Sequence, residues 1–105
     1  MKIEFDPEVD AAYLRLSDAD VIDSEEIATD IVYDFDADEQ IVGIELLQVR
    51  TNLPYFAVVP LPFQKVEQQV EFISFLETIA EAELRSKLVF AKQILQNQTA
   101  FLQRI

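Results

Sequence analysis

The sequence contains no cysteine, no histidine and no tryptophan, and it has only one glycine and four prolines in 105 residues. Without cysteine and histidine, the chain has no disulfide, no thiolate zinc site, no cysteine nucleophile and no serine–histidine triad. A single glycine also excludes the glycine-rich loops that bind phosphate groups. Carboxylates, tyrosine hydroxyls, lysine and arginine are the catalytic groups that remain. We therefore expect a protein that is not an enzyme and that needs no cofactor.

Basic residues are scarce, since 8 lysines and arginines stand against 20 aspartates and glutamates, for a formal net charge of −12. Nucleic acid and anionic lipid are both bound through basic side chains, so we expect neither as a partner. No apolar run approaches the roughly 20 residues of a membrane-spanning helix. The first residues lack the apolar core of a secretory signal, and we expect a soluble cytoplasmic protein.

The charge is distributed unevenly along the chain. Residues 1–50 carry 15 acidic and 3 basic groups, whereas residues 51–105 carry 5 of each. An acidic surface either keeps a protein soluble or faces a cation or a basic protein. The second interpretation assigns partner binding to five acidic residues: Asp23, Glu25, Glu26, Asp34 and Asp36.

Apolar residues in the first half alternate with polar ones, as in short strands of an antiparallel sheet. The alternation predicts strands near residues 2–6, 12–16, 31–36 and 41–49, and a weaker strand near an edge at residues 21–27. Gly43 lies within the last of these segments, where a lone glycine fits a bulge or a close approach of the backbone. We expect residues 1–50 to form an acidic β-meander of about five strands.

The second half has a helical composition. Residues 51–62 form a proline-containing connection, in which the apolar run Tyr55–Val59 can add a short strand. Residues 63–105 lack glycine and proline, and apolar residues recur at steps of three and four, which predicts one or two long helices. One helix of this length would extend about 60 Å, so it either breaks or projects toward another chain. The expected fold is α+β, in one compact domain or one unit of a dimer.

The helical region is more apolar than a solvated helix requires, and a large apolar surface on a small protein usually meets a partner. We expect a homodimer, and the alternative is packing of the same residues on the protein's own sheet. The side chains assigned to the dimer contact are Leu84, Leu88, Leu95, Phe101 and Leu102.

An acidic segment partly matches a calcium-binding loop. Asp34, Asp36 and Asp38 stand at positions 1, 3 and 5 of an EF-hand register, and Glu45 stands at position 12. Position 6, which needs glycine, is Glu39, and both flanks have the alternation of strands rather than the periodicity of helices. A strand–turn–strand arrangement explains the same residues because aspartate is favoured in turns. We keep these carboxylates only as a secondary hypothesis for a metal site.

A second acidic group, Asp6, Glu8 and Asp10, surrounds Pro7 close to Tyr13. Paired carboxylates can act as general acid and base. A turn with hydrogen-bonded aspartate side chains explains the same residues, and we prefer it.

Four segments of the first half resemble one family of small bacterial domains. The segment FDPEVDAAYLRL at residues 5–16 contains the D-P turn and the D-A-x-Y pattern, and VGIE at residues 42–45 matches a characteristic strand. Together with Ser24–Glu26 and Asp34–Asp36, they resemble the domain of unknown function 2283 family over residues 1–50. The family commonly has glycine in the hairpin turn, where this chain has Asp38–Gln40.

The resemblance implies a compact β-rich domain without established catalytic residues. Some members resemble antidotes encoded beside small toxins, which would suit an acidic sheet facing a basic protein. The sequence thus predicts a non-catalytic, homodimeric interaction protein with an antidote-like acidic sheet. The alternative is a cation-dependent carboxylate site, either sensory or hydrolytic.

Overall fold

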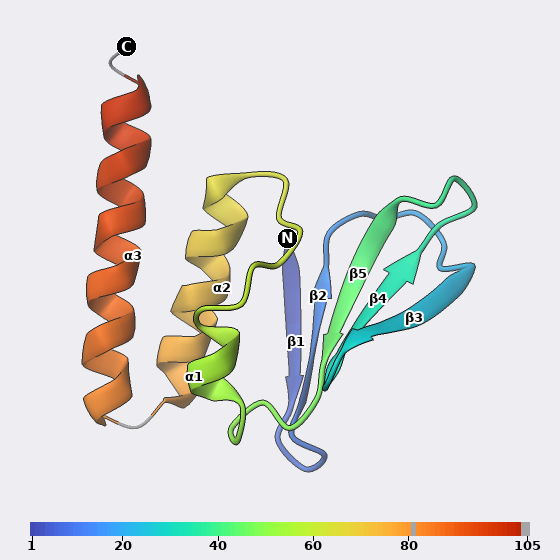
Figure 1. The fold of residues 1–105 in the computed structure, drawn as a ribbon, viewed down its shortest axis with the longest axis horizontal. Helices are drawn as coiled ribbons and strands as arrows, with labels where there is room; N and C mark the ends of the chain where they lie inside the picture. The colour runs from blue at the N-terminus through green and yellow to red at the C-terminus, as the bar shows by residue number, and fades with distance from the viewer. Residues whose placement is uncertain (81, 104–105) are drawn as a thin grey trace. The chain divides into compact units, whose positions relative to one another are not determined.

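The computed structural model describes residues 1–80 and 82–103, and it describes their side chains except at 82–84, 86 and 99–103. The chain forms two compact units, residues 1–52 and residues 53–105. The first unit contains the strands β1 (Lys2–Asp6), β2 (Ala11–Arg15), β3 (Asp23–Ala28), β4 (Ile31–Phe35) and β5 (Ile41–Leu46). The second contains the helices α1 (Leu53–Phe56), α2 (Val66–Ile79) and α3 (Ala82–Gln103) (Figure 1). The predicted α+β fold is confirmed.

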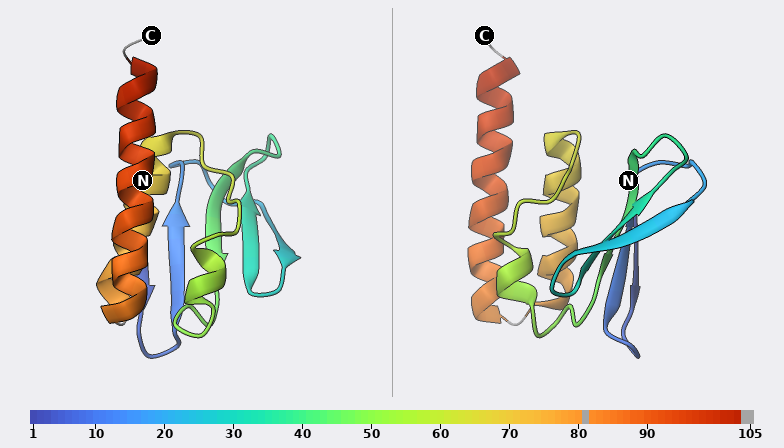
Figure 2. Two further views of the ribbon diagram at one scale, coloured as in Figure 1. Left: turned by 60° about the vertical axis from the view of Figure 1, so that its left-hand side comes forward. Right: turned by 45° about the vertical axis from the view of Figure 1, so that its right-hand side comes forward.

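The five strands form one antiparallel sheet in the order β1-β2-β5-β4-β3. The β1–β2 hairpin and the β3-β4-β5 meander are joined by pairing of β2 with β5, in which Tyr13 lies opposite Glu45. Figure 2 shows the strands from two further directions, with β3 at an outer edge of the sheet. This strand order places side chains of β2, near the start of the first unit, beside side chains of β5, near its end.

Side chains alternate between the two faces of the sheet, as strand geometry requires. One face supplies the apolar core of the first unit, with the buried residues Ala12, Leu14, Ile31, Val42, Ile44 and Leu46. The opposite face carries Tyr13, Asp34 and Glu45, which are neighbours in the ladders between β2, β5 and β4. The period-two pattern of the sequence therefore separates a core face from a polar face.

Two aspartates in left-handed backbone conformation close turns of the sheet. Asp10 has φ of 55° and Asp30 has φ of 63°, a region that aspartate tolerates better than most residues. The Asp10 carboxylate accepts a hydrogen bond from the Arg50 backbone N–H at 3.2 Å. The Asp30 carboxylate accepts one from the Asn52 side-chain amide at 2.8 Å. These acidic side chains attach the end of the first unit to its turns.

The β4–β5 hairpin turn forms without glycine. Asp36 Oδ1 accepts hydrogen bonds from the backbone N–H groups of Asp38 and Gln40, each at 2.9 Å. Glu39 has φ of 60°, the left-handed conformation that glycine adopts without steric cost. The carboxylate of Asp36 therefore stabilises a hairpin turn in which a residue other than glycine takes the left-handed conformation.

The short strand considered for residues 55–59 is wrong, because residues 53–56 form the helix α1. Pro54 lies in its first turn, where the missing backbone N–H costs no helical hydrogen bond. The carbonyl oxygens of Leu53 and Tyr55 accept hydrogen bonds from the N–H groups of Ala57 and Val59, at 3.1 Å and 2.9 Å. In the described part of the second unit, the short helix α1 is therefore present in addition to the two long helices of residues 63–105, which makes three.

The long helical region breaks at Ala80, which is extended with ψ of 151°. The Arg85 guanidinium donates hydrogen bonds to the carbonyl oxygens of Glu77 and Ala80, at 2.9 Å and 2.8 Å, and so satisfies the end of α2. Glu77 also forms an ion pair of 2.8 Å with Lys92 of α3. The two helices thus form a hairpin (Figure 1).

None of the helices within residues 1–80 and 82–103 has the length and apolar character of a membrane span.

Candidate functional site

The polar face of the sheet is organised around the only glycine of the chain. A Cβ atom at Gly43 would overlap Tyr13 Oη and would lie 2.6 Å from Tyr13 Cζ. The Tyr13 ring therefore lies over the backbone of Gly43, which accounts for a glycine in the middle of a strand. The sequence predicted a close approach at this position, and the approaching group is a side chain from β2.

Asp34 is the most enclosed polar residue of this face, with 4% of its surface exposed. The Ser24 hydroxyl on β3 donates a hydrogen bond of 2.6 Å to Asp34 Oδ1. The Asp34 side chain is also within hydrogen-bonding reach of Tyr13 and Glu45. One carboxyl group on β4 thus connects side chains from β2, β3 and β5.

The pKa of the Glu45 carboxyl is raised to about 7, first by its hydrogen bond with Asp34, then by burial, then by repulsion from the Asp34 charge. Two carboxyl groups can share a hydrogen bond only if one of them keeps its proton. The protons of such a pair belong to both groups together. The Asp34–Glu45 pair therefore retains a proton at pH values where ordinary carboxyl groups are ionised.

The hydroxyl of Tyr13 remains a hydrogen-bond donor at neutral pH. Burial raises the pKa of Tyr13, and a hydrogen bond from Arg15 opposes this rise, whereas the Asp34 carboxyl adds to it. Arg15 Nη1 donates to Tyr13 Oη at 3.5 Å, and its Nη2 donates to the Ala19 carbonyl oxygen. We call the five residues in contact here the polar cluster: Tyr13, Arg15, Ser24, Asp34 and Glu45.

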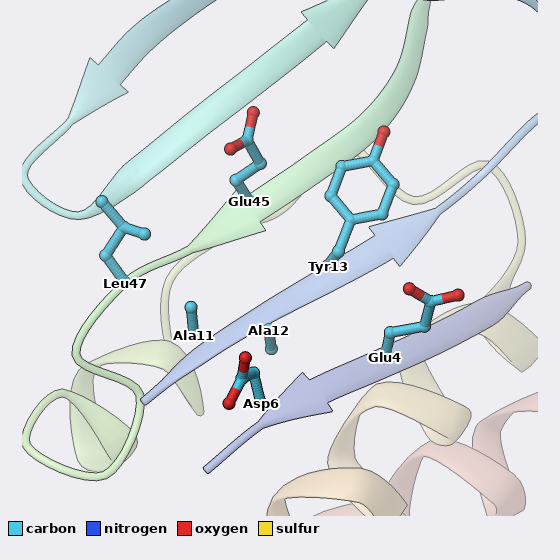
Figure 3. A pocket seen from close by; sticks show the side chains of 7 residues that line it. All are labelled: Glu4, Asp6, Ala11, Ala12, Tyr13, Glu45 and Leu47. Carbon is cyan, nitrogen blue, oxygen red and sulfur yellow. The ribbon is translucent and has the colours of Figure 1, made fainter. Parts of the chain in front are cut away.

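A shallow pocket of about 210 Å³ lies on the sheet beside the polar cluster. Its lining comprises Glu4, Asp6, Ala11, Ala12, Tyr13, Glu45 and Leu47. Figure 3 shows Glu4, Tyr13 and Glu45 rising from three neighbouring strands. Pockets for drug-sized ligands usually enclose about 300–1,000 Å³, so this depression is small by comparison.

The carboxylates considered for calcium do not converge. The structure brings Asp34 and Glu45 together, whereas Asp36 binds backbone N–H groups of the hairpin turn and Asp38 is exposed there. In the part of the chain that the structure describes, no group of three or more acidic residues could hold a metal ion. The EF-hand spacing thus arises from a strand, a turn and a second strand.

The other acidic group also serves the turn in which it lies. Asp6 Oδ1 accepts a hydrogen bond of 2.9 Å from the Glu8 backbone N–H. Asp10 binds the Arg50 backbone instead. Only Asp6 lines the pocket next to Glu45, so Asp6, Glu8 and Asp10 do not form one site.

The five acidic residues assigned to partner binding differ in accessibility. Asp23, Glu25 and Glu26 are exposed on β3, and Asp36 is half-buried. The assignment of Asp34 to partner binding is corrected, because its burial beneath neighbouring side chains prevents direct contact with a protein partner. Alternation alone placed Asp34 on the polar face, but contacts across four strands determine its burial.

One of the residues assigned to a dimer contact is inaccessible. Leu88 is buried, with 2% of its surface exposed, and Leu95 is half-buried. The side chains of Leu84, Phe101 and Leu102 lie outside the described residues. Among the side chains of α3 that the structure describes, Val89, Phe90 and Ile94 are exposed and apolar, with Phe90 67% exposed. Phe90 and Ile94 are spaced i,i+4, so the two form one stripe.

Sequence patterns did not reveal the polar cluster. Tyr13 and Glu45 are 32 positions apart, and they meet because β2 pairs with β5. The available signal was that Tyr13, Asp34 and Glu45 all fall in the segments that carry the family resemblance. The three side chains come together on one face of the sheet. A shared hairpin pattern alone would not require that arrangement.

The architecture is that of an α+β protein whose N-terminal antiparallel sheet carries a carboxyl–tyrosine cluster. Residues 2–50 match the model of a family described as "Protein of unknown function (DUF2283)". The match confirms the resemblance for the N-terminal part, and residues 51–105 lie outside it. Comparisons with curated proteins and with solved structures gave no match.

Proposed function

We propose that the protein is a non-catalytic interaction module that binds a basic, extended segment of another protein along β3. The observation that carries this proposal is the exposure of β3, in which five of six residues are exposed. β3 stands at the end of the strand order, so one side of its backbone is available for a further strand.

Charge complementarity determines the kind of partner. Asp23, Glu25 and Glu26 place three exposed carboxylates on β3, within a half of the chain that carries a large acidic excess. Opposite charges across an interface accelerate association and exclude partners of the same sign. An extended segment rich in lysine or arginine fits this edge. A basic toxin with such a segment would be a suitable partner for an antidote-like protein.

Neutralising β3 should weaken binding of a labelled decalysine peptide by about tenfold or more, since each lost carboxylate removes an attraction. The variant is Asp23→Asn, Glu25→Gln, Glu26→Gln, and fluorescence anisotropy at low and moderate salt measures the affinity. The control variant Glu8→Gln, Asp18→Asn, Glu67→Gln removes three exposed acidic charges outside both edge strands of the sheet. Equal losses in both variants would show that net charge, rather than the edge strand, attracts the peptide.

We also propose that α3 packs against a second copy of the chain. α3 has 22 residues and α2 has 14, so about 12 Å of α3 exceeds the length of its antiparallel neighbour. Residues 51–105 carry no net charge, and two copies meeting there avoid repulsion between acidic surfaces. The exposed side chains Val89, Phe90 and Ile94 form the apolar contact of this homodimer.

Phe90→Lys should convert the dimer to a monomer, because it places a charge in the apolar contact. Light scattering over a concentration series measures the molar mass. Gln69→Lys is the matched control, since Gln69 is exposed and lies on α2 rather than on the proposed contact of α3. A monomeric parent protein, or equal dissociation of both variants, would contradict the dimer.

A further inference from the structure

The Asp34 residue holds a central position in the sheet. Its backbone pairs with Ser24 of β3 on one side and with Gly43 of β5 on the other. Its side chain accepts a 2.6 Å hydrogen bond from the Ser24 hydroxyl and also contacts Glu45. An almost completely buried side chain therefore adds to the backbone ladders that attach β3 and β4 to β5.

Titratable and charged groups on β1, β2 and β3 lie on the same face of the sheet as the Asp34–Glu45 pair. They are Lys2, Glu4 and Asp6 on β1, Tyr13 and Arg15 on β2, and Glu26 on β3. The contacts of the two cations are with other groups: Lys2 pairs with Glu4 at 2.9 Å, and Arg15 donates to Tyr13 and to the Ala19 carbonyl oxygen. The stability of the pair therefore depends on its shared proton.

Loss of that proton to solvent would leave two anions within hydrogen-bonding distance of each other. The carboxylate of Asp34 cannot be hydrated in place, because only 4% of the residue is exposed. Like charges in such a site are relieved by separation of the groups or by entry of water. Glu45 is half-buried and lines the pocket, so its side chain can turn away from Asp34, and either response removes the side-chain hydrogen bond that joins β4 to β5.

The β3–β4 hairpin is the part of the sheet that can open locally. The ladder between β4 and β5 shifts register between Asp34 and Phe35, directly beside the pair. The ladder between β3 and β4 shifts between Glu26 and Ala28, and β3 is exposed along nearly its whole length. Segments with few buried contacts open locally at low free-energy cost.

We propose that the Asp34–Glu45 pair is a proton-operated latch, which holds the edge strand β3 closed when the pair shares a proton and loosens it when that proton leaves. The latch regulates the binding edge, and that consequence rests on the proposed function. A looser and more negative edge receives a basic strand more readily, so partner binding should strengthen as the latch opens.

Hydrogen exchange of the full chain, followed by NMR without a partner, tests the latch. Protection factors for β3 and β4 amides, corrected for intrinsic exchange rates, should fall about tenfold or more between about pH 5.5 and about pH 8. Amides of the β1–β2 hairpin should lose much less protection. In Glu45→Gln the β3 and β4 amides should keep their protection, whereas Glu8→Gln, which removes an exposed carboxylate of the β1–β2 turn, should behave like the parent protein.

Two results would overturn the latch: equal loss of protection throughout the sheet, or an unchanged pH dependence in Glu45→Gln. If Glu45→Gln does not fold, carboxyl carbon shifts of the parent protein decide the question. A Glu45 resonance that titrates like the exposed glutamates would refute the shared proton. Because no partner is present, these outcomes are separate from the decalysine measurement, which tests the binding edge itself.

Discussion

Gly43→Ala is expected to reduce the free energy of unfolding by about 2–3 kcal/mol, at the upper end for overpacking a core position. The added methyl group would lie 2.6 Å from Tyr13 Cζ, well inside van der Waals contact. Backbone conformation does not explain the loss, because Gly43 has no positive φ. Elsewhere in a strand, alanine would be more stable than glycine by roughly 0.5–1 kcal/mol. The predicted destabilisation therefore reports the contact with Tyr13.

A double-mutant cycle measured by urea unfolding tests this contact. Tyr13→Leu removes the ring above Gly43, so adding Gly43→Ala to it should cost little, with a coupling energy of about 1.5–2.5 kcal/mol. Tyr13→Phe is the control, because it retains the Cζ position that causes the overlap. Additive losses in Tyr13→Leu, Gly43→Ala would contradict the close approach.

Local patterns predicted the strands well but could not predict which strands are neighbours. Alternation located the edge strand β3, and the proline-containing turn after Asp6 located the β1–β2 hairpin. The pairing of β2 with β5 places Tyr13 beside Glu45, 32 positions later in the sequence. No single turn connects these two strands, so no local turn signal predicts that they pair. Because the polar cluster depends on that long-range pairing, the site was hidden although each of its residues lay in a recognised segment.

The acidic residues show a second limit of sequence interpretation. A count of charge treats Asp10, Asp30, Asp34 and Glu25 alike, yet only Glu25 is exposed. Asp10 and Asp30 bind groups at the end of the first unit, and Asp34 is buried. Burial and hydrogen bonding follow from tertiary contacts, so composition overstates the charge available to a partner.

The helical break has a similar explanation. Residues 63–105 contain no glycine or proline, the usual residues at a helix end. The chain nevertheless turns after Ile79, where Arg85 satisfies carbonyl groups of α2 and Lys92 pairs with Glu77. These contacts form only after the hairpin closes, so local propensity could not distinguish one helix from two.

The pH dependence of stability should depend mainly on Glu45 between about pH 5.5 and about pH 8. Its pKa is about 7 in the folded protein, above its ordinary value of 4.5, so folding favours the protonated form. This stabilisation is complete below about pH 4.5 and is lost as the pH rises through about 7. Partial solvent screening of a half-buried group limits the loss to about 1–2 kcal/mol.

The absence of histidine makes this pH range unusually informative. Ordinary carboxyl groups ionise near pH 4, so repulsion among the acidic residues is almost fully developed before about pH 6. Urea unfolding across the range should show falling stability in the parent protein and in Glu8→Gln, and nearly constant stability in Glu45→Gln. An equal decline in Glu45→Gln would mean that another group binds the proton. The comparison with Glu8→Gln separates the Asp34–Glu45 hydrogen bond from the general effect of removing one negative charge.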